Sequence, residues 1–169
     1  SLLTPYTILG GLAVMAVCLA HGAQFLALKT TGEVHDRANA IAAPATIGAT
    51  VLAAAWLIWG QFAYTTNVLA WIPLVVAALA IIASAAMSQA SLRHEGWSFA
   101  ASAVAIAGTV AWVFSSMAPA VQKSSINPAY SLTIDQASST TATLTVMTIV
   151  TVCLLPIVLV YVFWSYWMF

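Results

Sequence analysis

Long runs of hydrophobic residues, separated by short polar segments, dominate the chain. Each run has roughly 20 residues or more, the length that an α-helix needs to cross a hydrocarbon layer of ~30 Å. The runs do not alternate between polar and apolar residues, so they predict helices rather than the strands of a membrane barrel. The five predicted spans cover residues 5–28, 41–64, 68–90, 97–118 and 143–169.

Two prolines fall within these runs. Pro44 is expected in the first turn of the second span, where a missing backbone N–H is tolerated. Pro156 lies near the middle of the fifth span and predicts a kink there.

The order of spans and polar segments predicts the domain organisation. Residues 1–118 are expected to form a four-helix transmembrane bundle, and residues 143–169 one additional transmembrane helix. Residues 119–142 form the one substantial polar segment, with a turn signal at Asn127-Pro128. The predicted fold class is therefore an all-α membrane protein.

Composition supports this prediction. Hydrophobic residues make up 63% of the chain and charged residues 5%, against about 25% charged residues in a typical soluble domain. Four acidic and four basic residues could not cover a water-facing surface, and without a basic excess a nucleic-acid partner is not expected. Cys18 and Cys153 both lie inside apolar runs, so we interpret them as small hydrophobic residues rather than a disulfide.

The positions of the basic residues predict an orientation. Lys29, Arg37 and Arg93 fall in connections on one side of the membrane, and Lys123 falls on the other. Because cytoplasmic loops carry an excess of Lys and Arg, loops 29–40 and 91–96 and the C-terminus are predicted to be cytoplasmic. Loop 119–142 is then extracytoplasmic.

Small residues recur at helical spacing and predict how the helices pack, because they let two backbones approach closely. Three such stripes stand out, in the first, second and fourth spans: Gly11, Cys18 and Gly22; Ala45, Ala49 and Ala53; Ala101, Ala105 and Gly108.

His21 is the titratable side chain placed furthest inside a span, and it has two interpretations. It could be a haem ligand or part of a proton relay, because ionisable groups inside a membrane are costly and often functional. It could also be a neutral histidine bonded to a neighbouring helix. A bis-histidine haem needs a second intramembrane histidine, and His35 and His94 are expected in charged loops. The second interpretation is therefore favoured.

The charged segment 29–37 could in principle hold a metal or a phosphate, but its spacing fits no ligand pattern. A solvated turn with local ion pairs is the expected structure. No acidic residue falls within a predicted span, which argues against a proton pathway contained in this chain. No catalytic, cofactor-binding or metal-binding residue is predicted.

Two stretches resemble a known family. The first covers residues 21–33, HGAQFLALKTTGE, followed by Arg37-Ala38. The second covers residues 124–134, SSINPAYSLTI, followed by ASS at 137–139, LTVMT at 144–148 and PIVL at 156–159. Together with the opening TPY at 4–6 and LGG at 9–11, they resemble subunit II of the cytochrome bd-type quinol oxidases. That subunit has two four-helix bundles and one extra helix, and the chain is similar to the second bundle plus that last helix. We therefore expect it to be part of a longer polypeptide.

The resemblance implies a respiratory role in the bacterial plasma membrane: oxidation of a quinol coupled to reduction of dioxygen to water. In the family, two b-type haems, one haem d and the quinol site belong to subunit I. Subunit II carries no haem and forms a heterodimer with subunit I, to which small accessory membrane subunits can bind. The resemblance assigns no ligand role to His21.

Two alternatives remain open from the residues alone. One is a small membrane b-type cytochrome in which His21 binds haem. The other is a fragment of a secondary transporter, which would be expected to carry an intramembrane charge.

Overall fold

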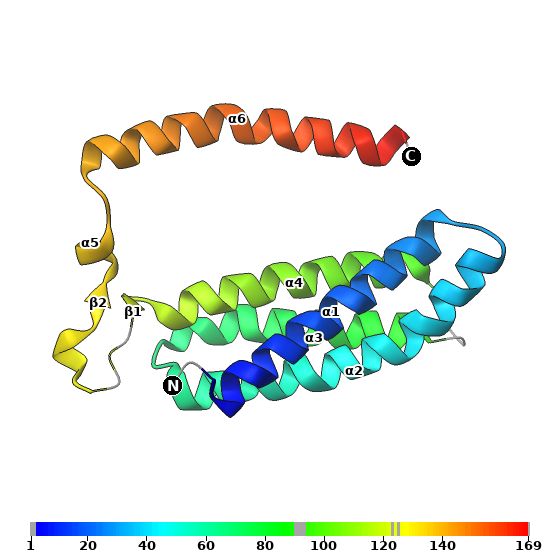
Figure 1. The fold of residues 1–169 in the computed structure, drawn as a ribbon, viewed down its shortest axis with the longest axis horizontal. Coiled ribbons are helices and arrows are strands. Elements are labelled where there is room, and N and C mark those ends of the chain that lie inside the picture. Colours follow the sequence, from blue (N-terminus) through cyan, green and yellow to red (C-terminus); the bar gives the residue numbers. More distant parts are fainter. Residues whose placement is uncertain (1–2, 90–93, 123, 125, 169) are drawn as a thin grey trace. The chain divides into compact units, whose positions relative to one another are not determined.

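The computed structural model describes residues 3–89, 94–122, 124 and 126–168 (Figure 1). The chain divides into two compact units, Ser1–Ala118 and Pro119–Phe169.

The first unit is a bundle of four long helices. They are α1 (Pro5–Lys29), α2 (Glu33–Tyr64), α3 (Trp71–Ser88), which continues the 3-10 turn η1 (Val68–Ala70), and α4 (Glu95–Met117). Helix α1 packs chiefly along α2, and α3 chiefly along α4. Figure 1 shows that helices next to one another in the sequence run in opposite directions. The predicted four-helix bundle is confirmed.

Local signals explain where α1 begins and ends. Thr4 and Thr7 form a capping box, in which each side chain bonds the backbone N–H of the other residue, and Pro5 takes the first helical position. At the other end the backbone N–H of Thr30 bonds the Leu26 carbonyl. Gly32 then adopts a φ of 68°, a left-handed conformation that suits glycine, and the chain turns into α2.

The second span begins eight positions earlier than predicted, at Glu33 instead of residue 41. Glu33 and Asp36 lie in the first turn of α2, where the positive end of the helix dipole favours acidic groups. The predicted loop 29–40 was therefore wrong, and the connection is reduced to residues 30–32. Pro44 lies inside α2 instead of in its first turn, and the helix changes direction along its length (Figure 1).

The bundle interior combines small residues with a few large ones. Leu57, Leu74, Ala77 and Trp112 pack together near one end, and Trp112 donates a hydrogen bond from Nε1 to Gln61 Oε1 at 2.8 Å. A second cluster, made of Ala53, Ile81 and Ala105, lies further along the bundle. The large side chains fill the space, and the small ones bring the helix axes close.

Two of the three predicted small-residue stripes are buried in the bundle, and the third is exposed. Ala49, Ala53, Ala105 and Gly108 are buried, so the stripes on α2 and α4 are packing faces as expected. The stripe on α1 was wrong: Gly11, Cys18 and Gly22 are exposed, and a methyl group on either glycine would meet nothing within 4 Å. A different set of small residues on α1 faces the bundle: Gly10, Ala13, Ala20, Ala23 and Ala27.

The second unit begins with a small hairpin. Strands β1 (Ala120–Gln122) and β2 (Leu132–Thr133) pair antiparallel, with η2 (Pro128–Tyr130) between them and the short helix α5 (Ile134–Ala137) after them. The predicted polar segment thus has local structure of its own. Helix α6 (Thr141–Met168) follows, with Pro156 inside it and with no buried residue.

Five helical segments of the described chain are long and apolar enough to cross a membrane: Pro5–Lys29, Glu33–Tyr64, Val68–Ser88, Glu95–Met117 and Thr141–Met168. Many large hydrophobic side chains are exposed on them, as expected for helices solvated by lipid. The predicted fold class is confirmed. Residues 90–93, 123 and 169, on which parts of the predicted boundaries and orientation depend, lie outside the described residues.

Candidate functional site

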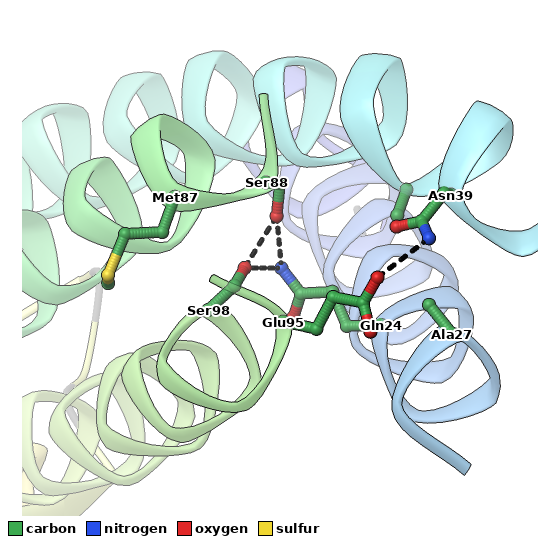
Figure 2. Close-up of a pocket in the computed structure, with 8 residues that line it drawn as sticks. Gln24, Ala27, Asn39, Met87, Ser88, Glu95 and Ser98 are labelled. Carbon is green, nitrogen blue, oxygen red and sulfur yellow. Dashed lines mark hydrogen bonds between the residues drawn. The ribbon is translucent and has the colours of Figure 1, made fainter. Parts of the chain in front are cut away.

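A cluster of buried polar side chains occupies one end of the bundle, close to the start of α2 and α4. Its centre is Gln24 of α1, which is 3% exposed. The Gln24 amide nitrogen lies 2.8 Å from Ser84 Oγ, 2.9 Å from Ser88 Oγ and 2.7 Å from Ser98 Oγ. Figure 2 shows Gln24 reaching from its helix toward Ser88 and Ser98. One side chain of α1 is thereby bonded to both α3 and α4.

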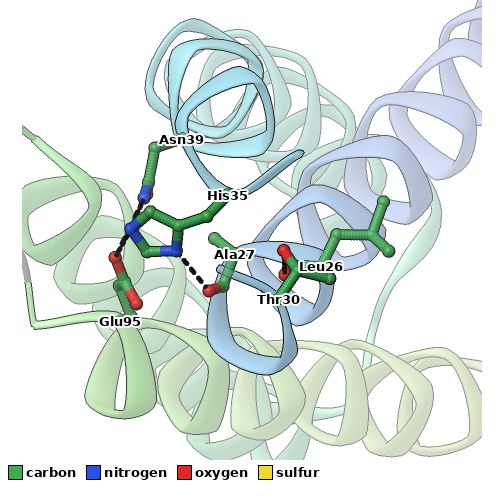
Figure 3. Close-up of polar contacts among 6 residues, drawn as sticks. All are labelled: Leu26, Ala27, Thr30, His35, Asn39 and Glu95. Carbon is green, nitrogen blue, oxygen red and sulfur yellow. Dashed lines mark hydrogen bonds and ion pairs between the residues drawn. The ribbon is translucent and has the colours of Figure 1, made fainter. Parts of the chain in front are cut away.

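A second group of polar contacts joins α1, α2 and α4 (Figure 3). His35 Nδ1 lies 2.8 Å from the carbonyl oxygen of Ala27, and His35 Nε2 lies 3.1 Å from Asn39 Nδ2 and 3.4 Å from Glu95 Oε1. Asn39 Nδ2 also donates to Glu95 Oε1 at 2.9 Å. We refer to His35, Asn39 and Glu95 as the helix-start triad.

The Ala27 carbonyl determines which nitrogen of the His35 ring carries a hydrogen. A carbonyl oxygen only accepts, so Nδ1 must carry a hydrogen and donate it. In the neutral ring Nε2 is then an acceptor and takes a hydrogen from Asn39. The Glu95 carboxylate lies 3.4 Å from the same nitrogen and accepts the other Asn39 hydrogen. With the ring in this tautomer, each polar atom of the contact has a complementary partner.

His21 lies about one helical turn before Gln24 on α1, closer to the middle of the helix. Its Nδ1 is 2.7 Å from Ser102 Oγ of α4, and its ring stacks on Phe99 with centroids 4.5 Å apart. The hydrogen-bonded histidine predicted from the sequence is found here. The Ser102 hydroxyl is itself 2.8 Å from the Phe99 carbonyl oxygen, to which it donates. Its oxygen is therefore left to accept from His21 Nδ1.

The family model for cytochrome bd terminal oxidase subunit II matches residues 1–169. The chain belongs to this family. It is 33% identical to cytochrome bd ubiquinol oxidase subunit 2 of Bacillus subtilis, in an alignment that covers 79% of the chain and 40% of that relative. It is 31% identical to cytochrome bd-I ubiquinol oxidase subunit 2 of Escherichia coli K12, with 98% of the chain and 52% of the relative covered. A probable cytochrome oxidase subunit 2 of Haemophilus influenzae is 30% identical, with 98% and 52% covered. The resemblance found in the sequence is thus confirmed, and the chain spans about half the length, or less, of these relatives.

Within this subunit II chain, the charged segment 29–37 is only partly the solvated turn that was predicted. Arg37 and Glu33 form an exposed ion pair at 2.5 Å, one helical turn apart, as expected of such a segment. His35, however, points into the bundle and is not in a loop. His94 precedes the first residue of α4 as its N-cap. Among the described residues, no group of three or more His, Cys, Asp or Glu side chains is placed to hold a metal ion.

Most of the polar cluster was not predicted from the sequence, because its glutamine and serine side chains carry no charge. A usable signal was present in the helical spacing. Glu95, Ser98 and Ser102 recur at three and four residues on α4, and His35 and Asn39 at four residues on α2. Each set shares one helix face. What the spacing could not show is that these faces, together with Gln24, meet in the interior.

Proposed function

We propose that the chain is part of the haem-free structural subunit II of a cytochrome bd-type terminal oxidase, an assembly that oxidises membrane quinol and reduces dioxygen to water. The match of the subunit II family model over residues 1–169 carries this proposal. Subunit I of the heterodimer holds two haems b, one haem d and the quinol site. This chain supplies a helical bundle that supports subunit I in the bacterial plasma membrane.

The contacts of the bundle support a structural role. His21 and His35 are the two histidines that face neighbouring helices, and each is bonded to a residue of another helix. A haem axial ligand would need an open ring nitrogen. His35 directs both nitrogens at Ala27, Asn39 and Glu95. His94 lies exposed at the N-cap of α4, so within the described bundle His21 has no second inward-facing histidine with a ring nitrogen open for bis-histidine ligation.

The outer surface supports a role as a partner of other membrane helices. Helix α6 has no buried residue, and large apolar side chains cover the outside of the bundle. Lipid, subunit I and small accessory membrane subunits are the proposed neighbours of these surfaces. The connection at 30–32 and the start of α4 are proposed to face the cytoplasm, with residues 119–142 on the opposite side.

Purification of the natural polypeptide that contains this chain, with its associated proteins, tests the proposal. We expect a haem-bearing partner to copurify and the preparation to oxidise quinol with consumption of dioxygen. After dissociation from the partner, the polypeptide should show no haem absorption. A preparation without any haem protein would contradict the proposal. Haem retained by the separated polypeptide would favour the small membrane cytochrome, and substrate flux after reconstitution alone would favour a transporter.

A further inference from the structure

A small pocket lies between the Gln24 network and the helix-start triad. Its volume is about 10 Å³, and Gln24, Asn39, Ser88, Glu95 and Ser98 contribute its polar lining. Figure 2 shows the side chains that line this pocket, with Gln24 coming from α1 and Glu95 from α4. Ala27, Ala42 and Met87 complete the wall, so the pocket is small, has both polar and apolar sides, and is bordered by residues from every helix of the bundle.

The serine hydroxyls fix the orientation of the Gln24 amide. Ser84 Oγ donates to the Ser98 carbonyl at 3.0 Å, and Ser98 Oγ donates to the Ser84 carbonyl at 2.9 Å. With their hydrogens used in this way, both hydroxyl oxygens can only accept, and the group facing them must be the amide nitrogen. A flipped amide would place Oε1 against two oxygens that have no hydrogen to give.

This orientation leaves the other end of the amide unsatisfied. Gln24 Oε1 is buried and has no hydrogen-bond partner among the described residues. Native structures rarely leave a buried carbonyl oxygen unpaired, because burial removes its hydrogen bonds to water and no protein hydrogen bond offsets the desolvation free energy. Asn39 does not donate a hydrogen bond to Gln24 Oε1, because its amide nitrogen is directed at Glu95 and His35.

We propose that the pocket binds one water molecule, which donates one hydrogen bond to Gln24 Oε1 and a second to the carboxylate of Glu95. A volume of about 10 Å³ is close to the space that a single water requires, and an internal water needs two to four polar partners. The pocket has this volume, and Gln24 Oε1 and the Glu95 carboxylate are two polar partners. The water links the buried serine hydroxyls to the helix-start triad, so that polar contacts run continuously from Glu95 to Ser84 in the interior.

A density map of the assembled membrane complex, at a resolution that shows other buried waters, tests this directly. We expect one peak within about 2.5–3.0 Å of Gln24 Oε1, the range of an O–H···O hydrogen bond. An empty pocket, or one filled by a side chain of another subunit, would overturn the proposal. So would a peak whose occupancy changes when sodium is exchanged for potassium, because the ligand would then be a cation.

Two matched variants show whether Gln24 holds the water. Gln24→Met keeps the length of the side chain but removes both polar atoms, and the peak should disappear. Gln61→Met makes the same change at a buried glutamine that bonds Trp112 instead, and the peak should remain. A peak that survives Gln24→Met contradicts the assignment. If that variant does not assemble, the map of the unsubstituted complex decides alone.

Discussion

The ring of His35 lies 3.4 Å from the carboxylate of Glu95, which joins the first turn of α2 to the first residue of α4. The same ring bonds the Ala27 carbonyl near the end of α1. Three helix ends thus meet at one histidine. Both side chains are about one-quarter exposed, so their interaction is less screened by solvent than that of a surface ion pair.

Removal of Glu95 is expected to destabilise the bundle. Glu95→Ala removes the carboxylate that accepts one of the two Asn39 Nδ2 hydrogens and that lies beside His35, and the loss of a hydrogen bond to a charged group costs about 1–3 kcal/mol. The apparent melting temperature of the purified complex in detergent should fall. Thermal unfolding followed by tryptophan fluorescence measures it.

Glu33→Ala is the matched control for that experiment. Glu33 is also an acidic residue in the first turn of a helix, but its side chain is 77% exposed and pairs with Arg37 at the surface. Its loss should cost no more than about 0.5 kcal/mol. Equal shifts in the two variants would mean that the helix dipole, and not the triad, accounts for the effect of Glu95.

The bond between Trp112 and Gln61 predicts a coupled pair. Gln61→Leu leaves the buried Trp112 Nε1–H without an acceptor and should cost about 1–3 kcal/mol. In Trp112→Phe the donor is absent, so adding Gln61→Leu should cost less there than in the unsubstituted protein. A double-mutant cycle on unfolding free energy measures the difference. Strictly additive effects would show that this hydrogen bond does not stabilise the bundle.

Gly60 is expected to tolerate no side chain. A Cβ at this position would lie 2.5 Å from Cη2 of Trp112 and would also meet the Tyr6 hydroxyl. Gly60→Ala should therefore destabilise the protein by about 1–3 kcal/mol, as overpacking does. Gly48→Ala on the same helix is the control, because nothing lies within 4 Å of its added methyl group. Replacing a helical glycine by alanine there should instead stabilise slightly. Melting temperatures that rise in both variants would contradict the packing around Gly60.

His21→Gln tests the structural interpretation of the intramembrane histidine and rests on the proposed function. Glutamine can still bond Ser102, so the complex should assemble with unchanged haem content and largely unchanged quinol oxidation. Pyridine haemochrome spectra and oxygen consumption measure the two quantities. Loss of one haem on this substitution would show that His21 is a ligand.

A revised expectation concerns the surface of α1. Because Gly11 and Gly22 are exposed, Gly11→Leu and Gly22→Leu should leave the internal packing of the bundle intact. Gly10→Leu should disrupt it, because even a Cβ at Gly10 would lie 2.7 Å from Trp56 Nε1. Protease resistance of the separated polypeptide in detergent would distinguish the three. Weakened assembly with other subunits in Gly11→Leu or Gly22→Leu, without a change in protease resistance, would place these glycines in an intersubunit contact.

The sequence by itself determined the membrane class, the number of spans and the family. These properties depend on the length of the apolar runs and on contiguous motifs, which need no knowledge of which faces meet. It did not determine where α2 begins, because the polar residues at 33–40 look like a loop until Gly32 is known to turn the chain and His35 to face inward. Nor did the sequence show which face of α1 packs against the bundle. Gly10 and Ala13 lie on the buried face and Gly11 and Gly22 on the exposed face, but all four residues are small, so residue size does not distinguish the two faces. Only the tertiary structure decided that Gln24, Ser98 and Glu95 share one buried pocket, because they come from helices about 70 residues apart whose rotation is set by packing.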